Sequence, residues 1–222
     1  MKKALVALLL AGFVSAALAH PFETQDAGML GAKRWSVEAV FGLTDTPINN
    51  NPDFTIGNVA VYYGVIDMLD VGLSLLSWDV QEGNVQWQPL ELFAKLAILK
   101  ETLSLETTIP LNFTSKWADN VFDIDVRAAL SIMMFNANLG FGLFSENRAF
   151  TYGLAVVPSI GPAFVGAEIT GETSSEWWDM GWGLGAGVDV RHVALTLGVH
   201  SSFRERKDQS WSLGVAVRFG GK

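Results

Sequence analysis

A stretch of alternating apolar and polar residues constrains the fold of this chain most strongly. Residues 121–134 read VFDIDVRAALSIMM, in which every second side chain from Phe122 onward is apolar. Successive side chains of a strand point to opposite faces of a sheet, so the other face of this strand carries Asp123, Asp125 and Arg127. A strand of a soluble sandwich has about five or six residues, whereas a tilted strand that crosses a bilayer needs about ten. The segment is therefore long enough to cross a membrane.

The first nineteen residues indicate export. Residues 1–19 contain two lysines, an uncharged run from Ala4, and the small-x-small sequence Ala17-Leu18-Ala19. This layout is typical of a secretory signal peptide, and we expect the mature chain to begin near His20. Nothing later reaches about 18 apolar residues without a charge, so we expect no transmembrane helix. An exported chain of this kind is either soluble or crosses a membrane as strands.

Composition excludes two other classes of protein. The chain has no cysteine, so it is not a small secreted scaffold held by disulfides. Removal of two lysines with residues 1–19 changes the net charge from −8 to −10, because 13 basic and 23 acidic residues remain. Binding to nucleic acid needs clustered Lys and Arg, so we predict no nucleic-acid partner.

The alternation repeats along the rest of the chain. It predicts twelve strands, at residues 33–44, 54–66, 70–80, 85–99, 102–113, 121–135, 137–144, 150–157, 161–170, 179–190, 192–202 and 210–219. Counts of ten or fourteen are the alternatives. Tight links at residues 67–69, 100–101, 136, 158–160 and 191 alternate with longer, more polar connections.

An outer-membrane barrel has this pattern of connections. Such barrels have short periplasmic turns, longer outer loops and an even number of strands, with both termini in the periplasm. The sequence therefore predicts an all-β, antiparallel transmembrane barrel over residues 33–222, preceded by a periplasmic or lumen-facing segment at 20–32. A soluble sandwich or a lipocalin-like barrel is the alternative, because each would show the same alternation with its apolar face inward.

Tryptophans lie near the ends of the predicted strands. They are Trp35, Trp78, Trp87, Trp178 and Trp211. Aromatic residues of membrane barrels concentrate at the two membrane–water interfaces. Their positions agree with strands that span a bilayer in the outer membrane.

With the apolar face in lipid, the opposite face lines the lumen. Its ionisable residues are Glu38, Glu91, Lys95, Glu106, Asp123, Asp125, Arg127, Glu168, Asp179, Asp189, His200 and Arg218. Eight acids against three permanent cations predict an acidic, water-filled pore that favours cations or neutral solutes. The alternative is a plugged interior, in which Asp123, Asp125 and Glu106 pair with Arg127, Lys95 or Arg218 in a mainly structural or surface-interaction barrel. A twelve-stranded barrel lies between the filled eight-stranded and the open sixteen-stranded kinds.

Four glycines alternate along one predicted strand, at Gly181, Gly183, Gly185 and Gly187. Glycine within a strand marks a bend or the close approach of another backbone. One hypothesis is that residues 20–32, or an inward loop, lie against this glycine stripe and constrict the lumen. The alternative is that the glycines offset large inward side chains.

Candidate chemistry is sparse. The best catalytic group is His200 with Ser202 on the same face and Glu205 nearby, the parts of a nucleophile, a base and an orienting acid. Outer-membrane lipid A deacylases resemble this arrangement, so a lipid hydrolase is a further alternative, although His200 faces the lumen. His20 and His192 are too scattered for a metal site, and we predict no cofactor and no enzymatic activity.

The connection at residues 203–209 carries Arg204, Arg206 and Lys207. It could bind the anionic headgroups of lipopolysaccharide, or it is a solvated charged loop. The bilayer and small solutes are the other predicted partners.

Two motifs resemble a known family. The sequence HPFETQDAGMLG at residues 20–31, followed by a strand with RWSVE, resembles the start of small outer-membrane barrels of the "MetA-pathway of phenol degradation" transporter type. Residues 63–72, YGVIDMLDVG, resemble that family's strand, tight turn and strand. The resemblance implies an outer-membrane protein that transports small solutes. We therefore predict a passive channel or transporter in the outer membrane.

Overall fold

A computed structural model describes residues 27–45, 53–81, 84–87, 90–111, 124–143, 150–173, 178–190, 192–203 and 209–220. Within these ranges the chain forms strands β1 (Arg34–Asp45), β2 (Asp53–Ile66), β3 (Leu69–Gln81), β4 (Asn84–Trp87), β5 (Leu90–Leu99), β6 (Leu103–Leu111), β7 (Ile124–Ile132), β8 (Phe135–Leu143), β9 (Phe150–Val156), β10 (Ser159–Ile160), β11 (Ala163–Thr173), β12 (Trp178–Val190), β13 (Val193–Ser202) and β14 (Gln209–Gly220). No helix of the described residues is long and apolar enough to cross a membrane.

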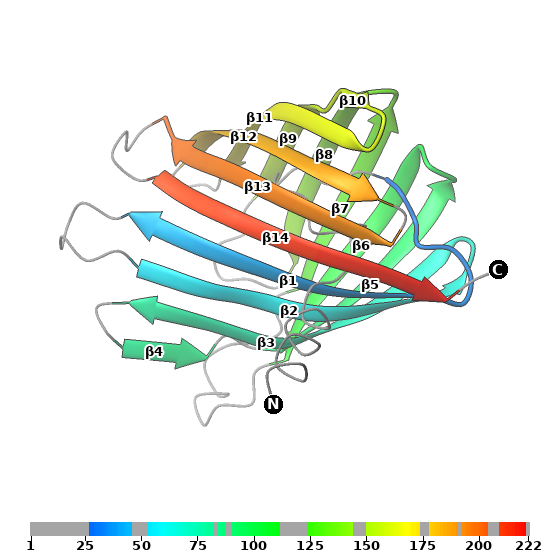
Figure 1. The fold of residues 1–222 in the computed structure, drawn as a ribbon, viewed down its shortest axis with the longest axis horizontal. Helices are drawn as coiled ribbons and strands as arrows, with labels where there is room; N and C mark the ends of the chain where they lie inside the picture. The colour runs from blue at the N-terminus through cyan, green and yellow to red at the C-terminus, as the bar shows by residue number, and fades with distance from the viewer. Residues whose placement is uncertain are drawn as a thin grey trace.

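The strands close into one antiparallel barrel (Figure 1). Along the wall the strands pair in the order β11-β12-β13-β14-β1-β2-β3-β5-β6-β7-β8-β9, and β9 pairs with β11 to close the barrel. β4 pairs with β3, and β10 pairs with β11. All sheet edges are then paired around the wall, which removes the exposed edges that an open sheet would present. The predicted fold class, an all-β antiparallel barrel, is confirmed.

Fourteen strand segments make twelve barrel strands. On β3, Trp78 faces Trp87 of β4 and Ser74 faces Glu91 of β5, so β4 and β5 follow one register without a shift. On β11, Ala167 faces Val156 of β9 and Phe164 faces Ser159 of β10, again without a shift. The two pairs of segments are therefore two strands, and the predicted count of twelve is confirmed.

Two predicted turns are wrong in position. The link between β7 and β8 is Met133-Met134, with Met133 in the left-handed region at φ 57°, and not Asn136, which pairs with Ser131 inside the sheet. Residues 159–160 form β10, and the chain turns afterwards at Gly161, where φ is +62° and glycine is favoured. In both places the strand includes residues that the sequence predicts as a turn, Asn136 in β8 and Ser159–Ile160 in β10.

The two faces of the wall have the predicted chemistry. The buried polar side chains include Ser36, Ser74, Ser104, Asn138 and Thr196, which alternate along their strands with exposed apolar residues. The outward face carries exposed apolar side chains on every long strand, including Phe41, Leu92, Leu105, Leu154 and Leu197. The interior of the barrel is therefore polar and its exterior is apolar.

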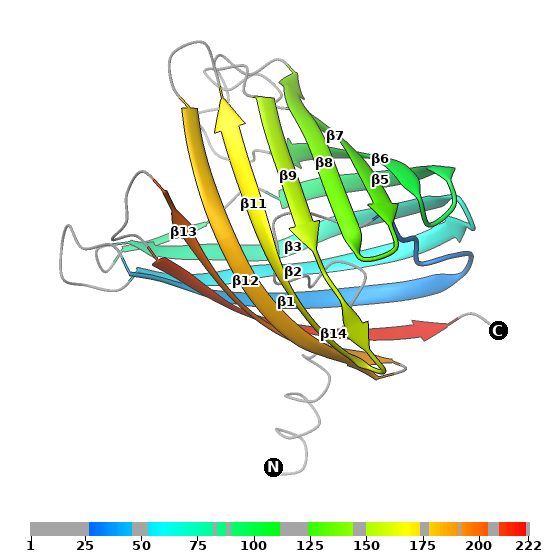
Figure 2. The same cartoon turned by 90° about the horizontal axis from the view of Figure 1, so that it is seen from above.

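Tight turns, the end of β14 and the segment before β1 gather at one end of the barrel (Figure 2). We call this the short-turn end. Its aromatic side chains include Trp35, which lies 4.5 Å between ring centroids from Tyr63 and faces Phe219 in the register. At the opposite end, Trp178 and Trp211 are exposed on the outward face. Their positions agree with the predicted aromatic girdles, although the side chains of Trp78 and Trp87 lie outside the description.

Candidate functional site: the barrel lumen

Four charged residues of alternating sign follow one another across four neighbouring strands. Asp70 on β3 faces Lys95 on β5, Lys95 faces Glu106 on β6, and Glu106 faces Arg127 on β7. Residues directly opposite in an antiparallel pair lie on the same face, with Cβ atoms about 5 Å apart. Asp70, Lys95 and Glu106 are all buried. We call these four residues the charge ladder, and they place three of the predicted lumen residues side by side.

Beyond the charge ladder, the same line of facing residues continues around the wall toward the end opposite the short-turn end. From Arg127 the register passes through Gly140, Thr151 and Glu172 to Asp179 on β12. Asp70 lies beside the β2–β3 turn at the short-turn end, whereas Asp179 lies at the start of β12, next to the opposite end. The line winds from one end to the other because barrel closure requires tilted strands. A solute that follows this line would meet both signs of charge.

A histidine and a glutamate meet across an intervening strand. His200 Nδ1 on β13 lies 3.2 Å from Glu168 Oε1 on β11, and the Glu168 side chain is fully buried. The strand between them carries Gly183, which faces both residues in the register. A Cβ on Gly183 would lie 2.7 Å from Glu168 Oε1 and 2.8 Å from His200 Nδ1. The absence of a side chain at Gly183 therefore makes room for this pair.

Two further contacts involve predicted lumen residues. Arg218 Nη2 donates to Asp189 Oδ2 at 2.8 Å, near the short-turn end. Ser202 Oγ donates to Asp179 Oδ1 at 2.8 Å. The Ser202 hydroxyl proton thus points at a carboxylate, which does not match a nucleophile that gives its proton to His200.

The remaining predicted residues are distributed over the wall. Glu38 is buried and faces Ala60 and Ala216, while Glu91 faces Ser74 and Pro110. Asp125 faces Thr108 and Gly142. Asp123, together with the loop residues Arg204, Glu205, Arg206 and Lys207, lies outside the described residues, as do residues 1–26 with His20.

Residues 27–32, which we call the strap, cross the short-turn end. The backbone N–H of Ala27 donates to Ser131 Oγ on β7 at 2.8 Å, and that of Leu30 donates to Asp70 Oδ2 on β3 at 2.7 Å. β5 and β6 separate these two anchor strands in the sheet. The backbone N–H of Ala32 donates to Asp67 Oδ1 in the β2–β3 turn at 3.1 Å. The strap therefore bridges two parts of the wall, in agreement with its course in Figures 1 and 2.

The strap is also packed into the barrel. Ala27 is fully buried and Leu30 is 4% exposed, in a cluster with Ala60 and Tyr62. Where the strap meets β2, a Cβ on Gly64 would overlap the carbonyl oxygen of Gly31. Only glycine at position 64 permits this close approach.

Among the described residues, side chains and not the strap lie over the glycine stripe. The described part of residues 20–32 lies against Gly64, Asp70 and Ser131, on β2, β3 and β7, and not against the stripe on β12. Side chains of neighbouring strands cover the stripe instead: Glu168 and His200 lie over Gly183, and the Phe164 ring lies over Gly187. The alternative, that these glycines offset large inward side chains, describes these two positions.

Sequence reasoning missed three residues of this region. Asp70 begins the predicted strand at residues 70–80, beside a turn, and alternation places it on the same inward face as Ser74. Tyr62 has the same parity as the buried Ala60 and could have been found from the alternation. Ser131 shares the polar face of its strand with Arg127, but its role as an anchor depends on Ala27, which is 104 residues away in the chain.

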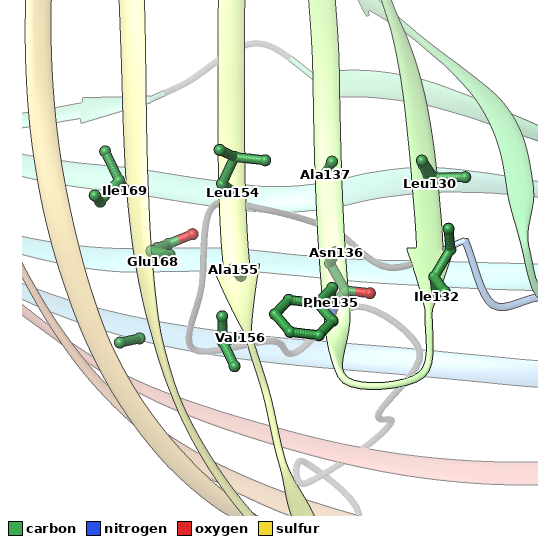
Figure 3. A pocket seen from close by; sticks show the side chains of 11 residues that line it. Leu130, Ile132, Phe135, Asn136, Ala137, Leu154, Ala155, Val156, Glu168 and Ile169 are labelled. Atoms are coloured by element: carbon green, nitrogen blue, oxygen red, sulfur yellow. The ribbon is translucent and has the colours of Figure 1, made fainter.

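Outside the lumen, the outward face of the wall has a hollow (Figure 3). This groove of about 420 Å³ is bounded by exposed apolar side chains of β7, β8, β9 and β11, among them Leu130, Leu154 and Ile169. It lies on the apolar exterior. The described residues contain no group of three or more His, Asp or Glu that could hold a metal ion.

Comparisons with known proteins support the fold. No family of known proteins and no curated protein matches the chain. Among solved structures, the chain is similar to the KdgM porin, with a TM-score of 0.58 and 10% identity over 84% of this chain and 99% of that one. Other similar structures are a Rhodopseudomonas blastica porin (TM-score 0.38, 10% identity, 84% and 99% covered) and Salmonella typhi OmpF in complex with daunomycin (TM-score 0.39, 6% identity, 85% and 98% covered). The first similarity shows that this chain has the β-barrel fold found in porins.

Proposed function

We propose that the protein is a passive channel for small solutes in the outer membrane. The observation that carries this proposal is the closed barrel with a polar, charged interior and an apolar exterior. Charges on the lipid side of a barrel would cost about 2 to 4 kcal/mol for Arg or Lys near the midplane, so this surface fits a bilayer. Strands of 12 to 14 residues at β1, β2 and β3 are long enough to span it.

The described lumen is acidic, which favours cations over anions. Its acids are Glu38, Asp70, Glu91, Glu106, Asp125, Glu168, Glu172, Asp179 and Asp189, and its permanent cations are Lys95, Arg127 and Arg218. Rings of Asp and Glu set cation preference in channels. The proposed solutes are therefore small cations and small neutral molecules, and no enzymatic step is needed. The similarity to transporters of the phenol-degradation type, drawn from the sequence, remains a prediction.

Reconstitution into planar lipid bilayers tests the channel. The expected result is discrete conductance steps, with a reversal potential in a salt gradient that shows cation preference. A refolded barrel that inserts into the bilayer and carries no current would contradict the proposal.

A closed, mainly structural barrel is the second candidate, because the strap favours it. The strap fills part of the lumen at the short-turn end, and the charge ladder neutralises part of the interior. Silent bilayers with the intact chain and also with the strap removed would support this candidate over the channel.

A further inference from the structure

The residues around Leu30 in the lumen resemble a ligand-binding site. We call this site the seat: its floor is formed by Ala60 and by the rings of Tyr62 and Phe93, whose centroids lie 5.6 Å apart. Leu30 packs against this floor, while its backbone N–H donates to Asp70 Oδ2 at 2.7 Å. The strap thus presents an apolar body to aromatic rings and a hydrogen-bond donor to a carboxylate.

One oxygen of the Asp70 carboxylate is free to accept a further hydrogen bond. Asp70 is buried, and its second oxygen, Oδ1, has no hydrogen-bond partner among the described residues. A buried acceptor without a donor costs free energy, so a ligand that brings another donor would be stabilised here. Asp70, Lys95 and Glu106 all line the cavity beside Leu30, so its charged lining consists of two acids and one cation.

The space beside Leu30 is too small for a solute while the strap is in place. A cavity of about 20 Å³ remains there, lined by Gly28, Leu30, Tyr62, Asp70 and Phe93 among others. Such a volume holds about one water molecule. Any larger ligand must therefore displace the Leu30 side chain.

We propose that this seat is a binding site for a small solute with an apolar or aromatic body and a cationic, hydrogen-bond-donating head, and that Leu30 occupies it as an internal stand-in. The inference rests on the proposed channel, through which the solute reaches the seat. Binding of the solute displaces the Leu30 side chain from the rings. The Asp70 carboxylate then accepts hydrogen bonds from the head of the solute in place of the Leu30 backbone N–H. The strap is then a competitor that sets the affinity of the site.

Titration calorimetry of the refolded barrel in zwitterionic micelles tests the proposal, with benzylammonium as the probe. Leu30→Gly removes the competing side chain and should bind the probe about tenfold or more tightly than the original chain, because burying a leucine contributes enough free energy for a change of that size. Asp70→Asn in the Leu30→Gly background should weaken binding again by about tenfold. Met133→Gly, which alters a fully exposed turn residue, serves as the matched control and should leave the affinity unchanged.

A locked strap supplies the opposite test. The chain has no cysteine, so Ala27→Cys with Ser131→Cys creates a single possible disulfide at the contact between Ala27 and Ser131. The oxidised protein should not bind the probe, and reduction should restore binding. Ser104→Cys with Ala129→Cys, a pair that faces inward across β6 and β7, is the matched control, because it leaves the strap free.

The outcomes separate this site from the channel. Equal binding by Leu30→Gly and the original chain, or binding that persists in the locked protein, would overturn the proposed site. If Leu30→Gly does not fold, Leu30→Ala replaces it, with a smaller gain in affinity expected. A barrel that binds the probe and carries no current contradicts the channel alone, whereas a barrel that conducts and does not bind contradicts the site alone.

Discussion

At the scale of single residues, Gly183 holds the most informative position in the wall. Its lack of a side chain lets Glu168 and His200 meet across β12 at 3.2 Å. Neither neighbour can move far, because the Glu168 side chain is fully buried and both residues belong to paired strands. The requirement for glycine at position 183 thus arises from side chains of two neighbouring strands and not from a turn.

We expect Gly183→Ala to destabilise the barrel by about 1 to 3 kcal/mol, the range for overpacking a filled interior. The added methyl group would lie 2.8 Å from His200 Nδ1 and 2.7 Å from Glu168 Oε1. Urea titration in micelles measures the change in the free energy of unfolding. In a His200→Ala background one of the two collisions is absent, so the same substitution should cost less there. An equal cost in both backgrounds would show that the histidine does not determine the effect.

At the scale of elements, the charge ladder joins β3, β5, β6 and β7. Lys95 and Glu106 are both buried and lie between residues of opposite sign in the register. Removing one member of a buried charged group leaves its neighbours uncompensated. The ladder is therefore expected to stabilise this part of the wall as a unit.

Lys95→Met should destabilise the barrel by about 3 to 5 kcal/mol, the range for breaking a buried charge pair by removing one partner. Glu106→Gln in the same chain should recover part of the loss, because it removes the carboxylate left without its lysine. Urea titrations of the single and double variants measure the interaction free energy between the two sites. Strictly additive changes would mean that Lys95 and Glu106 do not interact.

The strap is the second element with a measurable role. Deletion of residues 21–32 should raise the single-channel conductance, because it removes Leu30 and Ala27 from the interior at the short-turn end. Planar bilayers measure the step size before and after deletion. As a control, Leu30→Gly keeps the backbone anchors and should raise the conductance less. Unchanged conductance after the deletion would show that the strap does not limit the current.

Sequence predicted the strands far better than the strap. Alternation is local, so twelve strands and their two faces follow from residues that lie next to one another. The β7–β8 turn was missed because Met133, Met134 and Phe135 contain no usual turn residue, whereas Asn136 does. The strap contacts join residues 40 and 104 positions apart, and no pattern within a strand encodes them.

At the scale of the whole molecule, closure determines what the charges can do. Charged residues are distributed along the register from Asp70 at one end to Asp179 near the other, so they act along the full path and not at one ring. Among the described residues the inward acids outnumber the inward cations, and the sequence predicts Asp123 on the same face as Asp125. The whole lumen is then expected to bear a negative potential that attracts cations.

Replacing Asp123 and Asp125 together by asparagine should lower the cation preference of the channel, because the sequence alternation predicts both acids on the inward face and asparagine has nearly the same size. The reversal potential in a tenfold gradient of potassium chloride should move toward zero, and more so at low ionic strength, where charges are screened less. Asp67→Asn with Glu101→Gln removes the same number of acids from turns at the short-turn end and should shift the potential less. Equal shifts for the two pairs would mean that overall charge, and not the β7 side of the lumen, sets the preference. A loss of stability with no current to measure would instead identify Asp123 and Asp125 as partners within a closed interior.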